Sequence, residues 1–381
     1  MKELSFLHSL EAASAWIFLL SFLVAYLVLP GIIYVVIRRN LMDNPNERSS
    51  HSQKTPTMGG ISFYVSLAFT IFFIRDYDVD YMGINVISAV SIMFFLGLKD
   101  DLLGVNPSTK IIGQILATLI LFFGTKLTIN SLDGFLLINE IPFWTSVLFG
   151  CFVMMSIVNS FNLIDGINGS AAMVGIVIFS CFAYVFYMSD NGYYFLLSLL
   201  CIGFLLAFLR YNLSSKKKIF MGDTGSMVVG FIIGFLAIKF LSLSPSELEQ
   251  AFISPSNKMW VLLAIVFIPF FDTTRVFIAR TISHGKPFKA DRNHIHHVMI
   301  DYMGLSHGKA SFLLAVINLL IFLVVLCLNT LFSQVYLVLS LLLIFVGMVL
   351  KLFYFNRSYL TRKSKQKIRK ILQSSLHKNR K

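Results

Sequence analysis

The chain has 381 residues, of which 56% are hydrophobic and 14% aromatic, while only 13% are charged. A soluble domain carries about 25% charged residues, so the composition excludes a soluble protein and predicts a polytopic membrane protein. The net charge of +13 then indicates basic cytoplasmic loops and argues against a nucleic-acid-binding surface. The four cysteines lie in apolar runs, which favours packing residues over disulfides or a zinc site. They are Cys151, Cys181, Cys201 and Cys327.

Apolar runs of transmembrane length follow one another along most of the chain. A bilayer crossing takes about 20 helical residues, and charges or Pro, Gly and Asn clusters divide the chain into eleven such runs. The sequence therefore predicts an all-α polytopic membrane protein with about eleven transmembrane helices. The expected spans are residues 12–37, 58–75, 82–98, 109–125, 143–159, 169–189, 193–209, 225–243, 259–271, 310–330 and 333–354.

The distribution of basic residues predicts the orientation. The first span is followed by Arg38 and Arg39, and most of the 32 Lys and Arg residues fall in the odd-numbered loops and the tail. Positive loops stay cytoplasmic, so we expect the N-terminus outside and the C-terminus inside. Residues 1–354 are expected to form one membrane-embedded domain, and 355–381 a basic cytoplasmic tail. The alternating residues of loop 126–142 predict a small exterior hairpin.

Carboxylates and histidines concentrate in the same predicted cytoplasmic loops. Carboxylates at membrane-helix ends are costly unless they are paired or bind a cation. Several of them on separate loops predict a site for a hard cation, with solvated loop charges as the alternative for any single one. The aspartates are Asp43, Asp100, Asp101, Asp165, Asp223, Asp272, Asp291 and Asp301, and the histidines are His51, His284, His294, His296, His297 and His307.

Two loop motifs predict the centre of such a site. Asp100 and Asp101 diverge by about 100° on a helix, so one can face a metal ion and the other a second reactant. In NSFNLIDGING, Asn159, Asn162 and Asp165 recur every three residues and are expected to line one side of a polar cavity. A capped turn between two helices is the alternative for that segment.

Two further motifs favour phosphate binding. FMGDTGS (220–226) opens the eighth expected span, where a helix N-terminus favours anions; a plain helix cap is the alternative for Asp223. PFKADRNHIHH (287–297) places three histidines beside Arg292, which favours an anion clamp over a transition-metal site that has no cysteines. The combined motifs predict phosphoryl transfer between a cytosolic phosphate and a lipid-borne partner. An ion-coupled transporter is disfavoured because the span middles are almost uncharged.

In this order and on one face, the motifs resemble the polyprenyl-phosphate N-acetylhexosamine-1-phosphate transferases, which include phospho-MurNAc-pentapeptide transferase. The resemblance covers residues 41–300. It is carried by MDNPNERSSH, PTMGG, KDDLLG, NSFNLIDGING, GDTGS, PFFDTTRVFIAR and DRNHIHH. The HIHH segment is similar to that of the branch that uses UDP-GlcNAc and undecaprenyl phosphate.

The resemblance implies an enzyme of the bacterial cytoplasmic membrane that transfers GlcNAc-1-phosphate from UDP-GlcNAc to undecaprenyl phosphate and releases UMP, with Mg²⁺ (or Mn²⁺) as cofactor. It is the first membrane step of a cell-envelope glycan such as lipopolysaccharide, and a homodimer is a candidate assembly. The implied catalytic residues are Asp100, Asp101, Asp165 and Asp223, of which Asp101, Asp165 and Asp223 are also the implied metal ligands. The implied substrate-binding residues are Asp43, His51, Asn162, Asn168, Arg280, Asp291, Arg292, His294, His296 and His297.

One position departs from the family pattern. Many members carry a second aspartate in DGxDG, where this chain has Asn168. An amide can coordinate through its carbonyl oxygen but cannot act as a base. We therefore expect Asn168 to bind rather than to accept a proton, and GalNAc, QuiNAc and FucNAc stay open as alternative sugars. The expected reaction is a single displacement, with an aspartyl-phosphate route through Asp223 or Asp165 as the alternative.

Overall fold

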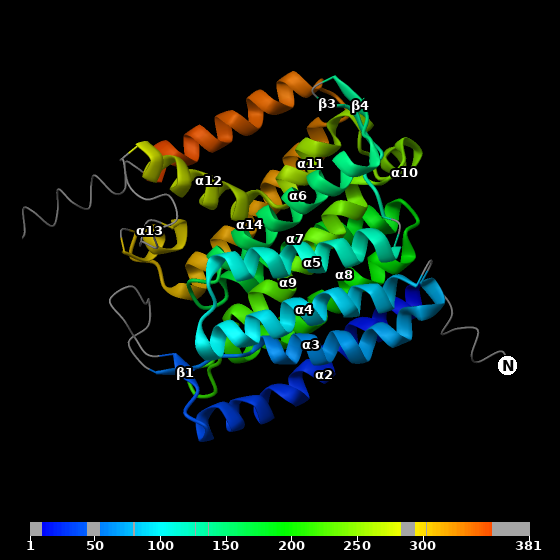
Figure 1. Ribbon diagram of the computed structural model, residues 1–381. Helices are drawn as coiled ribbons and strands as arrows, with labels where there is room; N and C mark the ends of the chain where they lie inside the picture. Colours follow the sequence, from blue (N-terminus) through cyan, green and yellow to red (C-terminus); the bar gives the residue numbers. More distant parts are fainter. Residues whose placement is uncertain are drawn as a thin grey trace, which may run out of the picture.

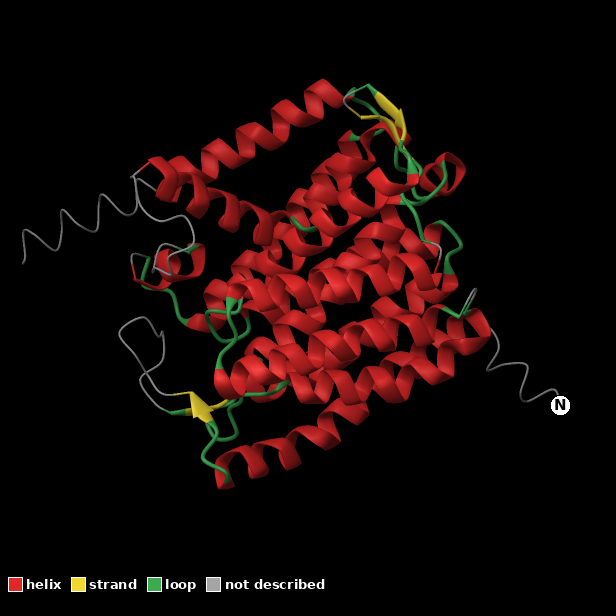
Figure 2. Cartoon of the chain, in the orientation of Figure 1, coloured by secondary structure: helices red, strands yellow, loops and turns green. Residues whose placement is uncertain are grey.

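The computed structural model describes residues 10–43, 54–78, 81–125, 127–135, 137–282, 294–301 and 303–352. Within these residues the chain is a bundle of long helices with small strand pairs near its two ends (Figures 1 and 2). In chain order the elements are α2 (Leu10–Arg38), β1 (Met42–Asp43), β2 (Thr55–Pro56), α3 (Gly60–Thr70), η1 (Ile71–Tyr77), α4 (Met82–Leu103), α5 (Pro107–Thr125), β3 (Ser131–Phe135), β4 (Ile138–Glu140), α6 (Phe143–Ile164), α7 (Ser170–Met188), α8 (Gly192–Asn212), α9 (Gly222–Leu241), α10 (Pro245–Gln250), η2 (Pro255–Asn257), α11 (Lys258–Ile265), α12 (Phe267–Ile282), α13 (Ile295–Asp301), α14 (His307–Leu328) and a last helix, Gln334–Leu352.

The prediction of an all-helical polytopic membrane protein is confirmed. In the part of the chain that the structure describes, nine helices are long and apolar enough to cross a membrane, and a bent pair makes ten if it counts as one span. The expected span 58–75 is an α-helix only as far as Thr70 and continues as the 3₁₀-helix η1. Tight 3₁₀ turns are common at helix C-termini, and this one carries the charged residues Arg75 and Asp76.

The expected span 259–271 is not one straight helix, because it is divided between α11 and α12, which meet at an angle of 75° and can count together as one bent span. Pro269 explains the break, since proline has no N–H and its ring clashes with the carbonyl four residues earlier, here that of Ile265. Asn318 of α14 supplies the missing partners: its Nδ2 donates to the Ile265 carbonyl at 2.8 Å, and its Oδ1 accepts from Ile268 N at 2.9 Å. The bend carries α12 on to Ile282, so Asp272 lies on a helix and not in a loop.

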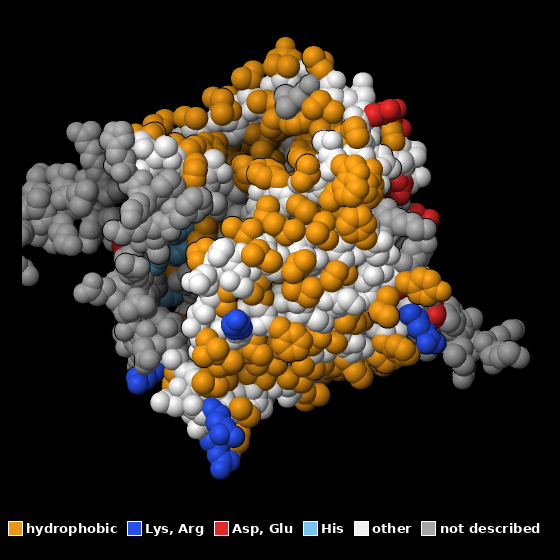
Figure 3. All heavy atoms as spheres, in the orientation of Figure 1, with side chains coloured by type: hydrophobic (Ala, Val, Ile, Leu, Met, Phe, Trp, Pro, Cys, Tyr) orange, Lys and Arg blue, Asp and Glu red, His pale blue; other side chains and the backbone are white. Residues whose placement is uncertain are grey.

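Helix α9 is the centre of the bundle. It packs against α3, α4, α6, α7 and α11 (Figure 1). Of the residues in its apolar 18-residue stretch, 94% are buried. The outer helices instead expose large apolar side chains: Leu27, Leu148 and Leu343 are each more than 70% exposed. On the face in Figure 3 hydrophobic side chains cover the middle of the bundle. This surface is what a lipid-facing exterior requires.

The two strand pairs lie at opposite ends of the bundle (Figure 2). β3 and β4 form an antiparallel pair in which Ser131 faces Glu140 and Phe135 faces Ile138, which confirms the hairpin expected in loop 126–142. We call this the hairpin end. The other end holds α13 and the short β1–β2 pair, and we call it the site end.

Candidate active site

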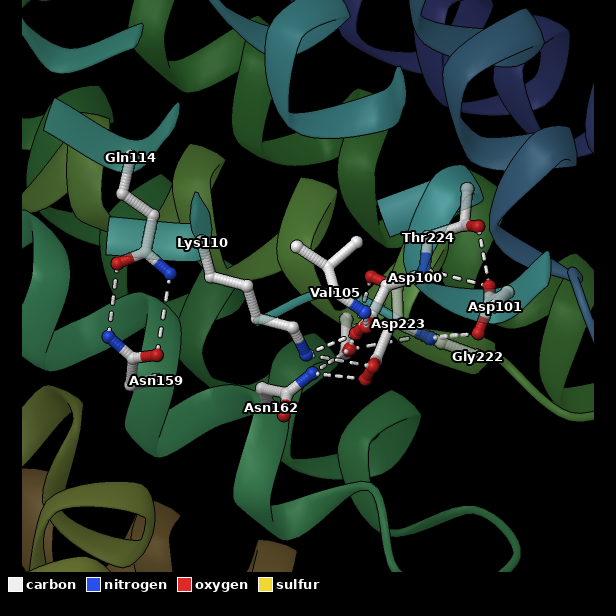
Figure 4. A network of polar contacts seen from close by, with 11 residues as sticks. Asp100, Asp101, Val105, Lys110, Gln114, Asn159, Asn162, Gly222, Asp223 and Thr224 are labelled. Atoms are coloured by element: carbon white, nitrogen blue, oxygen red, sulfur yellow. Dashed lines mark hydrogen bonds and ion pairs between the residues drawn. The ribbon is translucent and has the colours of Figure 1, made fainter. Parts of the chain in front are cut away.

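Four helix ends meet at the site end around the first turn of α9. The C-termini of α4 and α6 and the N-termini of α5 and α9 bring together Asp100, Lys110, Asn162 and Asp223 (Figure 4). The chain alternates direction from helix to helix, so loops far apart in the sequence share one end of the bundle. This is why the predicted polar motifs converge although apolar helices separate them.

Asp223 is the centre of this group. Its Oδ1 accepts from Asn162 Nδ2 at 2.7 Å, and its Oδ2 accepts from Lys110 Nζ at 3.1 Å. Lys110 Nζ also forms an ion pair with Asp100, while Asn162 Nδ2 donates to Ser226 Oγ at 2.8 Å. One ammonium thus lies between two carboxylates, which shows that Asp100 and Asp223 can serve a common cation.

Asp101 has a different task. Its Oδ1 accepts from Asp223 N at 2.8 Å, and its Oδ2 accepts from Thr224 N at 3.0 Å and from Thr224 Oγ1 at 2.5 Å. The first N–H groups of a helix have no partner within the helix, and α9 has no side-chain cap of its own. Asp101 therefore caps α9 from α4, and the carboxylate of Asp223 remains directed at Lys110 and Asn162.

Close backbone contacts hold this arrangement together. A Cβ on Gly60 of α3 would lie 2.1 Å from Gly225 N, and a Cβ on Gly97 of α4 would lie 2.6 Å from Thr224 Cα. Only glycine allows three helix backbones to approach so closely. The PTMGG and GDTGS motifs thus meet in space, and this contact sets the distance between Asp101 and the start of α9.

The loop after α6 links this group to α13 and α14. A Cβ on Gly166 would lie 2.1 Å from His296 Nε2, and the carbonyl of Asn168 accepts from Ser311 Oγ at 2.8 Å. The pKa of Asp165 is raised well above its usual range, because desolvation disfavours its charge and the carboxylates of Asp223 and Asp101 repel it. Asp165 thus lies close enough to Asp223 and Asp101 to interact with their charges.

A second polar group joins α12 to α13. The fully buried Asp272 accepts from His294 Nδ1 and Ile295 N, both at 2.8 Å, and from Arg275 at 3.0 Å. Burial lowers the pKa of His296 to about 3, so this imidazole is neutral at physiological pH. Its Nδ1 has no hydrogen-bond partner among the described residues. His296 can therefore donate or accept a hydrogen bond but adds no positive charge to an anion clamp.

The structure brings only part of the predicted set together. Asp100, Asn162 and Asp223 meet directly, Asp101 supports them through α9, and Asp165 lies beside them. The buried side chains of His294, His296 and His297 form a ring cluster at the start of α13, with His294 just before the helix, and Arg280 lies two turns beyond Asp272 on α12. Asp43 lies in β1. The expected site residues His51, Asp291 and Arg292, and the motif residues Asn46 and Arg48, lie outside the described residues.

Sequence reasoning missed two contributors, Lys110 and Arg275. Lys110 is a lone charge in the first turn of an apolar helix, and that isolation was the available signal. Arg275 lies one turn after Asp272, a spacing at which opposite charges pair on a helix.

The site has carboxylate ligands for a divalent cation, but few of these ligands surround a single point. In the described part of the chain, no three or more His, Cys, Asp or Glu side chains gather as a metal cluster. Asp100 and Asp223 do share the ammonium of Lys110. Two carboxylates plus substrate phosphates and water are the usual ligands of Mg²⁺, so the donor set fits that ion when it arrives with an anionic substrate.

Comparisons with known proteins agree with this chemistry. The model of glycosyl transferase family 4 matches residues 82–241, which hold Asp100, Asp101, Lys110, Asn162 and Asp223. Similar curated proteins include the decaprenyl-phosphate N-acetylglucosaminephosphotransferase of Mycolicibacterium smegmatis, 27% identical over 77% of this chain and 76% of the relative. The probable undecaprenyl-phosphate N-acetylglucosaminyl 1-phosphate transferase of Bacillus subtilis is 28% identical over 79% of this chain and 81% of its own.

The undecaprenyl-phosphate alpha-N-acetylglucosaminyl 1-phosphate transferase of Escherichia coli K12 is 28% identical over 68% of this chain and 69% of its own length. The resemblance predicted from the motifs is thereby confirmed. The relatives align with most of the chain, and the family match spans the helices that form the site. The chain is an enzyme related to the polyprenyl-phosphate sugar-1-phosphate transferases.

Proposed function

We propose that this enzyme transfers N-acetylglucosamine-1-phosphate from UDP-GlcNAc to undecaprenyl phosphate and releases UMP. The observation that carries the proposal is the meeting of Asp100, Lys110, Asn162 and Asp223 at one membrane-helix end. The names of the relatives support the polyprenyl-phosphate acceptor and the GlcNAc donor. Such an acceptor carries a hydrocarbon chain, and an apolar cavity of about 320 Å³ lies between α13, α14 and the last helix.

The proposed reaction is a single displacement. An oxygen of the lipid phosphate forms a bond to the β-phosphorus of the UDP-sugar, and the bond from that phosphorus to the bridging oxygen breaks, so UMP leaves with its phosphate. The nucleophile is already an anion, so positioning and charge neutralisation supply most of the catalysis. Mg²⁺, held by Asp223 and Asp100 when bound, would offset the charge of the diphosphate.

The remaining residues take supporting roles in this proposal. Lys110 neutralises the two carboxylates before substrates bind and is free to contact a phosphate when the cation replaces it. Asp101 holds the first turn of α9, and Asp165 completes the acidic group. The proposed sugar-diphosphate ligands are Asn168, Arg280, Asp291, Arg292, His294, His296 and His297, with Asp43 and His51 on the first loop.

We further propose that the site end faces the bacterial cytoplasm. The orientation of a membrane protein follows its basic loops, and Arg38, Arg39 and the run Lys216–Lys218 lie at this end, whereas Glu140 lies at the hairpin end. This orientation puts the N-terminus outside, the tail 355–381 inside, and the single domain 1–354 in the inner membrane. It lets a cytosolic nucleotide sugar and a lipid phosphate reach the same helix ends.

UMP release by the purified enzyme in detergent tests the proposal. UDP-GlcNAc, UDP-GalNAc and UDP-MurNAc-pentapeptide are each supplied with undecaprenyl phosphate and Mg²⁺. We expect release with UDP-GlcNAc that stops when either lipid or Mg²⁺ is omitted. Release only with another sugar would support the proposed reaction but change the donor sugar, and Asn168 would be the first position to substitute. No release with any sugar from folded protein would contradict the proposed function.

A further inference from the structure

Two amide side chains tie α5 to α6 beside the candidate site. Gln114 Nε2 donates to Asn159 Oδ1 at 3.3 Å, and Asn159 Nδ2 donates to Gln114 Oε1 at 3.1 Å (Figure 4). Asn159 Nδ2 also donates to the carbonyl of Met155 at 2.7 Å. Gln114 is 1% exposed, and an amide without a partner is costly among apolar helices. The buried amide of Gln114 therefore depends on Asn159, whose side chain is exposed and is also held by the Met155 carbonyl.

The spacing along each helix aligns this pair with the residues that hold Asp223. Gln114 lies four residues after Lys110 on α5, and Asn159 lies three residues before Asn162 on α6. Residues three or four apart share a helix face. Each helix thus presents one member of the amide pair and, one turn nearer the site, one donor to Asp223.

The contacts form a closed ring. The amide pair joins α5 to α6 directly, and Lys110 and Asn162 join the same two helices through Asp223. A slide or rotation of α5 along α6 would break both connections, because the amide pair bonds in both directions. The register of the two helices therefore decides whether Lys110 and Asn162 reach Asp223 together, and a misplacement of this order can cost a large factor in rate.

We propose that the Gln114–Asn159 pair is a positioning device for the transfer reaction, which sets the register at which Lys110 and Asn162 hold Asp223. The proposal rests on the proposed function, because it takes Asp223 to lie at the reacting phosphates. It differs from simple adhesion between helices. Adhesion alone would change the stability of the protein without changing the turnover of the folded molecules.

Kinetics of matched variants test the proposal. Gln114→Met and Asn159→Leu each remove the pair at similar volume, and the swap Gln114→Asn with Asn159→Gln restores it. The control is Thr118→Val, because Thr118 Oγ1 donates only within α5, to the Gln114 carbonyl at 2.7 Å. We expect each single variant to lower kcat about tenfold with KM within about twofold, and the swap to recover most of the loss. Equal kcat with only a lower Tm would overturn the proposal.

A double variant tests the route of the effect. If the pair acts through Lys110, Gln114→Met should lower kcat only slightly further in a protein that already carries Lys110→Met, because effects within one network are not additive. The same fold-loss of kcat in both backgrounds would contradict the proposal.

Amine labelling separates this inference from the proposed function, because it needs no turnover. Lys110 pairs with two carboxylates, so we expect slow acylation in the wild type, faster acylation in Gln114→Met, and no change in Thr118→Val, measured by mass spectrometry. Suppose that Gln114→Met is labelled faster but the wild-type protein releases no UMP. The proposed positioning role would then be supported, and only the proposed function would be contradicted. Unchanged labelling in Gln114→Met would overturn the positioning itself.

Discussion

Neighbouring aspartates at the end of α4 have separate tasks. Asp100 pairs with Lys110 and accepts from Val105 N at 2.7 Å, whereas Asp101 accepts three hydrogen bonds from the first residues of α9. The divergence of about 100° between successive helical residues explains the division. One carboxylate thus belongs to the charged centre and the other to its support.

Lys110→Met tests the charged centre. The substitution keeps the length of the side chain and removes the ammonium that Asp100 and Asp223 share. Without that charge the two carboxylates repel each other and substrate phosphates lose a cation, so we expect UMP release to fall roughly a hundredfold. Lys110→Arg keeps the charge and should retain more activity than Lys110→Met. Wild-type rates in Lys110→Met, measured on folded protein, would remove Lys110 from the reaction.

At the scale of elements, the site depends on how closely α3, α4 and α9 approach. Gly60 touches the backbone of Gly225, and Gly97 touches that of Thr224. These contacts place the end of α4 against the start of α9, where Asp101 finds its three donors. The close packing of these helices therefore also places Asp101 for its hydrogen bonds to α9.

Gly60→Ala tests the packing. The new Cβ would lie 2.1 Å from Gly225 N, which is backbone and cannot turn away. We expect a loss of roughly 1–3 kcal/mol in the free energy of unfolding, seen as a lower Tm in detergent, together with lower activity because α9 must shift. The matched control is Gly31→Ala, which meets nothing within 4 Å inside α2. An equal Tm for both variants would show that the close contact has no energetic importance.

Helix α10 offers a test of pH dependence at the hairpin end. Glu247 forms a capping box with Ser244 and accepts from Asn191 Nδ2 at 2.9 Å. Burial opposes its charge, but the hydrogen bonds from Asn191 and Ser244 and the charge of Lys239 outweigh that effect and lower the pKa of Glu247 below its ordinary value of 4.5. A lowered carboxyl pKa stabilises the fold above the ordinary value, and the stabilisation disappears as pH falls through the folded-state pKa.

Glu247→Gln should therefore lower stability in a pH-dependent way. At pH 7 we expect a loss of about 0.5 kcal/mol, small because the carboxylate is partly exposed. The Tm difference from wild type should shrink as the pH falls below 4.5. Glu249→Gln, at an exposed position of the same helix, serves as the control. A Tm difference that stays constant with pH would contradict the assignment.

At the scale of the whole molecule, periodicity and charge predict the helices well and their contacts poorly. Hydropathy places most spans within a few residues, because lipid demands long apolar helices. The sequence did not predict the bend at Pro269, because the side chain that pairs with the backbone groups left free there, Asn318, lies about 50 residues later. Lys110 was missed for the same kind of reason: its partner Asp223 is 113 residues away. Local patterns specify elements, whereas the pairing of their ends appears only in the folded chain.

The hairpin end contains a buried ion pair that separates stability from catalysis. Lys258 Nζ donates to Asp133 Oδ2 at 2.5 Å, to the Ser131 carbonyl at 2.9 Å and to the Leu241 carbonyl at 3.1 Å. Its side chain is 2% exposed. It thus joins β3, the end of α9 and the start of α11 at the end of the bundle opposite the site (Figure 1).

Lys258→Met should destabilise the protein without changing its chemistry. Removing one partner leaves the charge of Asp133 uncompensated, which costs roughly 3–5 kcal/mol for a buried pair, whereas Lys258→Met with Asp133→Asn should recover part of the loss. UMP release per folded molecule should stay at the wild-type rate, because the pair lies far from Asp223. Tm and activity are measured on the same samples, with the exposed Lys216→Met as control. A fall in activity per folded molecule would show that the hairpin end communicates with the site through α9.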